Sequence, residues 1–176
     1  SDFEGKVVYD DMAAAGSFET SNNILNQIYN NAWWGINSNY KSIPLDCPQR
    51  DERQPWLGDH TIGCIGESFV YDNERFYIKW LDDIRDSQTP EGKLSDIAPP
   101  YYMTYYSDNM TWPGTYLFVA DMIHKQYGNT EPIKKHYPYM KKWFMHMKDN
   151  YLNADYIMTK DKYGDWCVPP ESKELI

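Results

Sequence analysis

Apolar residues recur at spacings of three and four along most of the chain, the pattern of helices that bury one face. The first such stretch follows Ser21, which can cap it, and a short second stretch lies around residues 62–69. Asp59 or Thr61 can cap the second stretch, and Asp72 or Asn73 the third. Two more helices are predicted over about 113–127 and 130–151, and no convincing strand follows residue 16.

The apolar stripes predict which side chains these helices bury. In the first two helices they are Ile24, Leu25, Ile28, Tyr29, Ala32 and Ile36, then Ile62, Ile65 and Phe69. In the other three they are Phe76, Tyr77, Trp80, Leu81 and Ile84, then Tyr116, Leu117, Ala120 and Ile123, then Tyr137, Met140, Phe144, Met147 and Tyr151. Gly128 ends the fourth helix, Thr130 can cap the fifth, and Pro138 implies a kink or a later start for the fifth.

Long loops separate these helices at every second connection, at residues 44–59, 88–109 and 156–176. A simple four-helix bundle has short connections, so it does not fit. The alternation predicts paired helices in an all-α toroid, with the long loops gathered on one face. We interpret residues 88–109 as a binding loop, because long loops in compact domains are usually functional or disordered, and four tyrosines argue against disorder.

The composition argues against some classes of binding partner. A net charge of −9 argues against nucleic acid and against anionic membrane surfaces, since both attract basic proteins. No apolar run approaches about 20 residues, so we expect no transmembrane helix. Three cysteines at irregular spacing form neither a zinc pattern nor a disulfide framework. No signal peptide is visible, and the cellular compartment stays open.

The stretch from Pro44 to Asp59, PLDCPQRDERQPWLGD, is the densest cluster of ionisable groups near an aromatic ring. Asp46, Glu52 and Asp59 can converge if the loop folds back, and a pair of carboxyls in different environments is the minimum for acid–base work on a glycosidic bond. Like charges and the indole of Trp56 would raise the pKa of one carboxyl, while Arg50 or Arg53 pairs with an ionised one. The alternative is a solvated loop with local ion pairs.

Aromatic residues in the other loops extend this chemistry. Trp112 and Trp166 lie outside the helical stripes, and Asp165 precedes Trp166, so each loop offers a ring that can pack on a sugar face. Their alternative role is to anchor the loops. Of the four histidines, only His60 is near the charged loop, and Cys47 is more typical of a small buried residue than of a nucleophile. The acidic spacing does not match an EF-hand, so we expect no metal and no cofactor.

The run Asp46-Cys47-Pro48-Gln49-Arg50-Asp51-Glu52-Arg53, followed by Trp56, Gly58 and Asp59, resembles the signature of bacterial α-L-rhamnosidases of glycoside hydrolase family 78. Upstream, Gly16-Ser17-Phe18-Glu19 resembles the start of that family's catalytic domain. Downstream, Trp112 and Tyr163-Gly164-Asp165-Trp166 are similar to its later loops. One departure is Pro55, which stands where the family usually has a glycine.

The resemblance implies an (α/α)6 barrel and an inverting hydrolase that removes terminal α-L-rhamnose. It implies that Glu52 is the general acid and that Asp46, Arg50 and Asp59 hold the sugar hydroxyls. It also implies that Trp56, Trp112 and Trp166 line the pocket. The family's general base is a distant downstream glutamate with no match in this sequence, so we expect the rest of the same polypeptide to supply it.

The expected domains are therefore an N-terminal segment 1–16, with a β-like run at Lys6–Tyr9, and the first half of the catalytic barrel over 17–176. We interpret 1–16 as the end of a preceding β domain. A barrel of twelve helices exceeds the five found, so unpaired helix faces should be exposed. The alternatives are another α-toroid carbohydrate enzyme with different sugar specificity, a non-catalytic sugar-binding relative, or a structural helical module.

Overall fold

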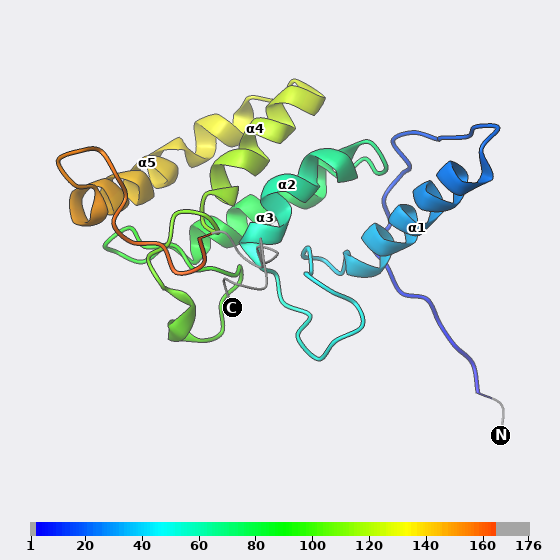
Figure 1. The fold of residues 1–176 in the computed structure, drawn as a ribbon, viewed down its shortest axis with the longest axis horizontal. Coiled ribbons are helices and arrows are strands. Elements are labelled where there is room, and N and C mark those ends of the chain that lie inside the picture. The colour runs from blue at the N-terminus through cyan, green and yellow to red at the C-terminus, as the bar shows by residue number, and fades with distance from the viewer. Residues whose placement is uncertain (1–2, 165–176) are drawn as a thin grey trace, which may run out of the picture.

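The computed structural model describes residues 3–164, and within them the chain is helical with isolated bridges in place of strands. Figure 1 shows helices α1 to α5, which span Asn23–Asn39, Leu57–Ser68, Glu74–Asp86, Thr115–Tyr127 and Glu131–Tyr151. A short 3-10 helix, η1, covers Met103–Tyr105. The prediction of an all-α chain is confirmed, and the β-like run at Lys6–Tyr9 forms no strand because it is exposed and unpaired within the described residues.

Short turns and long connections alternate along the described chain, as predicted. Residues 69–73 join α2 to α3, and residues 128–130 join α4 to α5. Residues 40–56, 87–114 and 152–164 are the long connections; Figure 1 shows the first two below the helices and the third curving from the left end of α5 down toward them, with the short turns at the upper right. α2 packs on α4, and α3 packs on α4 and α5. The result is a double layer of helices whose long loops meet at one end.

Helices α3 and α4 hold the centre of the core. Tyr77, Trp80, Leu81 and Ile84 of α3 are fully buried, as the stripe predicted. In α4, Tyr116, Ala120 and Ile123 are buried as predicted, but Leu117 is exposed. Burial of large aromatic and aliphatic side chains contributes roughly 1.5–3 kcal/mol each, so this stripe fixes α3 against α4.

The predicted inward face of α2 was wrong. Ile62 is 86% exposed, and Ile65 and Phe69 are exposed with it. The helix instead buries a second stripe, made of Leu57, His60, Cys64 and Ser68. Both faces have the correct spacing, and the mixed one is buried because its polar groups find partners inside: His60 Nδ1 lies 3.3 Å from the Tyr77 hydroxyl and 3.6 Å from the Glu67 carboxylate.

Exposed apolar faces also occur on the other helices. In α1, Ile24 is 71% exposed, and Leu25 and Ile28 are exposed too, so that predicted stripe faces outward in this chain. In α5, Met140 and Met147 are buried, but Tyr137 and Phe144 are exposed, and His136 and Trp143 are buried in their place. Such faces are what we expected of helices whose partners lie elsewhere in a barrel.

Several helices begin at other residues than the sequence predicted. Asn22, not Ser21, caps α1 and accepts hydrogen bonds from the backbone N–H groups of Ile24 and Leu25. α2 begins at Leu57, before the predicted caps, and the extended Trp56 is its N-cap residue. Gly128 ends α4 in the left-handed conformation, as predicted.

Helix α5 runs unbroken through Pro138, so a later start was wrong. Pro138 is exposed, and water can therefore satisfy the carbonyl group that loses its donor. No helix in the described part of the chain is long and apolar enough to cross a membrane.

Two glycine substitutions test how the second long loop is seated. A Cβ at Gly92, which has φ of +105°, would lie 2.9 Å from the Lys142 carbonyl oxygen of α5, whereas one at Gly66 in α2 meets nothing within 4 Å. Gly92→Ala should destabilise the protein by at least about 1 kcal/mol, and Gly66→Ala should leave it unchanged or stabilise it by up to about 1 kcal/mol. Urea unfolding of both variants measures this, and a neutral Gly92→Ala would contradict the close approach.

Candidate active site

The loop from Pro44 to Trp56 folds back on itself beside helix α2. The Asp46 backbone N–H donates to the Gln54 carbonyl oxygen at 3.0 Å, and the Gln54 N–H donates to Asp46 Oδ1 at 2.7 Å. The second long loop holds the end of this one, since the Leu57 N–H donates to the Asp96 carbonyl oxygen and the Ala98 N–H to that of Pro55. This doubled-back path brings Asp46 next to Glu52, as the sequence predicted.

The guanidinium of Arg50 lies between the two carboxylates. Its Nη2 is 3.1 Å from Asp46 Oδ2 and 3.2 Å from Glu52 Oε2. The other Glu52 oxygen, Oε1, accepts a hydrogen bond from the indole N–H of Trp56 at 2.7 Å. Asp46 has only 4% of its side chain exposed, whereas Glu52 has 34%. Glu52 is therefore oriented by two donors and still reaches solvent, as a group that exchanges protons with a ligand must.

Asp59 completes the group of acids from the first turn of α2, so it belongs to a helix and not to the loop. Burial raises the pKa of Asp59, and the negative charges of Asp46 and Glu52 raise it further, against an opposing effect of His60. The sequence predicted that like charges and burial would raise the pKa of one carboxyl, and in Asp59 burial contributes most and the like charges least.

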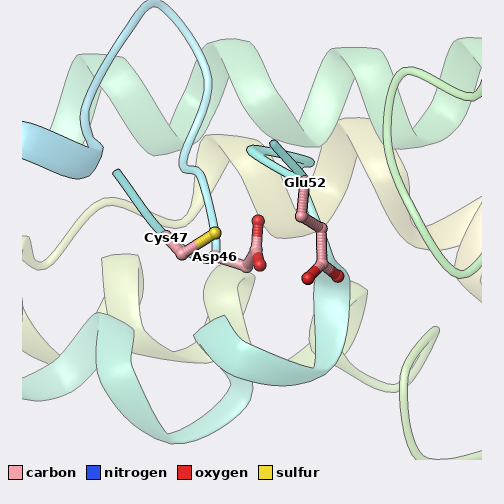
Figure 2. A group of neighbouring side chains, drawn as sticks. All are labelled: Asp46, Cys47 and Glu52. Carbon is pink, nitrogen blue, oxygen red and sulfur yellow. The ribbon is translucent and has the colours of Figure 1, made fainter. Parts of the chain in front are cut away.

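Asp46, Cys47 and Glu52 have possible metal-ligand atoms that all lie within 4.8 Å of one another, and Figure 2 shows these side chains turned toward a common space. Arg50 already fills this space with positive charge, because its Nε donates to Cys47 Sγ at 3.4 Å while Nη2 contacts both carboxylates. We therefore interpret the cluster as ion-paired and not as a metal site. Cys47 is buried, as expected of a small packing residue.

A cavity of about 240 Å³ opens above this cluster. It is lined by Asp46, Arg50, Glu52, Trp56, Asp59, Trp112 and Tyr163. These residues come from all three long loops and from the start of α2. The structure thus brings together every described residue that the sequence proposed as a site residue. Asp165 and Trp166 were also proposed, and they lie outside the described residues.

Aromatic rings form one wall of the cavity. The Trp112 and Tyr163 rings are 4.3 Å apart, and Trp56 meets Tyr163 edge-on at 6.2 Å. Gly58 lies directly under Trp112, where a Cβ would be 2.5 Å from the ring. Any side chain at Gly58 would therefore displace Trp112. Tyr163 was quoted in the sequence motif but not proposed for the pocket, because its contacts depend on residues far away in the chain.

Three aspartates fix the loops that carry these rings. Asp96 accepts a hydrogen bond from the Tyr163 hydroxyl at 3.1 Å, and Asp161 accepts the backbone N–H groups of Met110 and Thr111 at 2.9 and 3.1 Å. Asp108 Oδ2 lies 2.7 Å from Lys93 Nζ, and Asp108 Oδ1 lies 3.1 Å from Nε2 of His146 in α5. The second and third long loops are therefore tied to each other, and the Trp112–Tyr163 wall is held in place.

His60, the histidine nearest the charged loop in sequence, lies away from the pocket. It is 4% exposed and points into the core, where Glu67 accepts a hydrogen bond from the Tyr40 hydroxyl at 2.5 Å. Hydrogen bonds from His60, Tyr40 and Tyr77 outweigh the effect of burial and lower the pKa of Glu67. His60 and Glu67 thus stabilise the α2–α3 contact.

A known protein family matches most of this chain. The profile of the bacterial alpha-L-rhamnosidase 6 hairpin glycosidase domain matches residues 13–175. The chain belongs to this family. The fold described above is accordingly part of a six-hairpin (α/α)6 domain, and the resemblance predicted from the charged loop is confirmed.

The individual relatives are also alpha-L-rhamnosidases. An alpha-L-rhamnosidase of Formosa agariphila is 31% identical over 96% of this chain, which spans 18% of that protein's length. The structure of an alpha-L-rhamnosidase from Dictyoglumus thermophilum superimposes with a TM-score of 0.86 at 40% identity, covering 97% of this chain and 19% of that one. An alpha-L-rhamnosidase of Streptomyces avermitilis, solved as a complex with L-rhamnose, gives 0.85 at 29% identity, covering 92% and 16%. The chain spans less than a fifth of the length of these family members.

Asp108 makes the loop support sensitive to pH. Burial alone would raise its pKa, but hydrogen bonds from Lys93, Tyr151 and His146 outweigh this and lower it to about 2. Since an unfolded Asp has a pKa of about 3.9, the ionised form adds about 2 kcal/mol of stability above pH 4, and this is lost as pH falls toward 2.

Asp108→Asn should therefore be less stable than wild type at pH 7, and the gap should shrink below pH 4. Urea unfolding at several pH values measures it. Asp83→Asn is the matched control, because Asp83 forms an exposed pair with Lys79 that contributes little. A gap for Asp108→Asn that is the same at pH 3 and pH 7 would contradict the prediction.

Proposed function

We propose that this chain forms part of the active site of an α-L-rhamnosidase that removes terminal α-L-rhamnose from glycosides or polysaccharides with inversion. The observation that supports it most is the pocket: three carboxylates and an arginine face a wall of aromatic rings, in a chain of the rhamnosidase family. Acids and Arg can bind sugar hydroxyls, and rings pack on the apolar face of the sugar. A relative of similar fold was solved with L-rhamnose, which agrees with this substrate.

The proposal gives each pocket residue one task. Asp46, Arg50 and Asp59 hold hydroxyl groups of the rhamnose. Trp56 and Trp112 pack against its ring and methyl group. Asp165 and Trp166 keep their proposed place in the pocket, although they lie outside the described residues.

Glu52 is the proposed general acid, which protonates the oxygen of the leaving group. Its Oε2 lies 3.2 Å from Arg50 Nη2, and its Oε1 accepts a hydrogen bond from the Trp56 indole N–H at 2.7 Å. These two contacts orient the carboxyl group toward the cavity, where the glycosidic oxygen would lie.

The general base is proposed to come from the rest of the polypeptide. An inverting enzyme needs a second carboxylate about 6.5–9.5 Å from the acid, across the sugar from it, to activate water. Glu67, the nearest described candidate in sequence, is buried among tyrosines and does not line the pocket. The partner that completes the site is therefore the remainder of the barrel.

The acid role of Glu52 predicts an effect that depends on the leaving group. In the full-length protein, Glu52→Gln should lower kcat on methyl α-L-rhamnoside by about 10²–10⁴-fold, because the departing alkoxide needs a proton. The loss on 4-nitrophenyl α-L-rhamnoside should be smaller, because nitrophenolate leaves readily without one.

Asp51→Asn is the matched control, since Asp51 is fully exposed in the same loop. It should keep nearly normal kcat on both substrates. Equal losses on both substrates for Glu52→Gln would show that Glu52 only binds the sugar. Hydrolysis of other aryl glycosides but not of the rhamnoside would contradict the proposed substrate.

A further inference from the structure

A patch of exposed aromatic and thioether side chains lies beside the pocket and has no role in binding the rhamnose. Tyr101, Tyr102 and Met103 precede or begin η1 and are 56%, 63% and 75% exposed. The segment around them, PPYYMTYY over residues 99–106, contains no charged residue in a chain that is otherwise strongly acidic. Because these side chains are exposed among the described residues, they can contact a neutral ligand.

Ring contacts connect the patch to the proposed acid. Tyr105 lies 5.7 Å from Tyr101 and 6.2 Å from Tyr102, and it meets the Trp56 indole edge-on at 5.6 Å. Trp56 in turn donates its N–H to Glu52. The patch therefore continues from the side of the pocket where the acid lies.

The loop that carries the patch is held before any ligand arrives. The Asp96 backbone N–H donates to the Tyr105 carbonyl oxygen at 2.9 Å, and the Tyr106 hydroxyl donates to the Ser87 carbonyl oxygen at 2.6 Å. Fixed rings lose little conformational entropy on binding, which favours stacking on a ligand.

We propose that Tyr101, Tyr102 and Met103 form a subsite for the leaving group of the substrate, and that it takes a neutral ring with an apolar face. This inference rests on the proposed function. If Glu52 protonates the leaving oxygen, the rest of the leaving group starts at Glu52 and extends over the adjacent surface. Rings pack on phenolic rings and on the C–H faces of sugars alike, so the leaving group is a phenol or a second sugar.

The test compares three rhamnosides in the full-length protein: the methyl rhamnoside, which has no ring in its leaving group, a naphthyl rhamnoside, and a disaccharide of rhamnose with glucose. Tyr101→Ala should lower kcat/KM about tenfold on a ring-bearing substrate and less than about twofold on the methyl rhamnoside. Tyr101→Phe keeps the ring and should stay close to wild type. Tyr137→Ala removes an equally exposed tyrosine from α5 and should change nothing.

The outcomes separate the two proposals. A loss on the naphthyl substrate alone supports a phenolic leaving group, a loss on the disaccharide alone supports a sugar, and losses on both support a site for either. Equal effects on all three substrates, or no effect on any, overturn the subsite while leaving the rhamnosidase proposal intact. A wild-type protein that hydrolyses none of the three overturns both.

Discussion

The pocket holds three carboxylates close together, and their negative charges repel one another. The site therefore depends on a positive charge and hydrogen-bond donors that offset this repulsion. Arg50 supplies the charge by contacting Asp46 and Glu52 together. The Gln54 backbone N–H and the Trp56 indole take up the remaining strong acceptors. Burial raises the pKa of Asp59, and the neighbouring charges of Asp46 and Glu52 raise it further. The same compensation also explains why the chemistry depends on a folded-back loop: only this path brings Asp46, Arg50 and Glu52 within reach of one another.

The helices matter to this site because they hold the loop ends. The α3 stripe packs the double layer, and the short turns leave all three long connections on the same side. A second group of acids, Asp96, Asp108 and Asp161, then ties the later loops together by accepting backbone and side-chain donors. Acids thus serve two purposes here. Those at the pocket line the cavity, and those behind it accept the hydrogen bonds that hold the aromatic wall.

Sequence alone was sufficient where local chemistry decides the outcome. Glycine at position 128, the α3 stripe and the spacing from Asp46 to Asp59 each led to a correct prediction. It failed where two faces of a helix were equally plausible. In α2 the face with His60 and Cys64 was buried in preference to one with two isoleucines, and Tyr77, which is distant in the chain, contacts the Nδ1 atom of His60 there. Tyr163 was missed for a related reason, since its place in the wall arises from contacts with Trp112 and Asp96 across the fold.

The central claim is that the carboxylates and rings of these three loops form the rhamnose pocket, with Glu52 beside the bond that breaks. A crystal structure of the full-length Glu52→Gln protein, soaked with an uncleaved rhamnoside, tests it most directly. We expect the sugar ring between Trp56 and Trp112, its hydroxyls on Asp46 and Asp59, and the residue 52 amide about 2.6–3.2 Å from the glycosidic oxygen. A rhamnoside bound elsewhere, or bound here with residue 52 far from that oxygen, would contradict it.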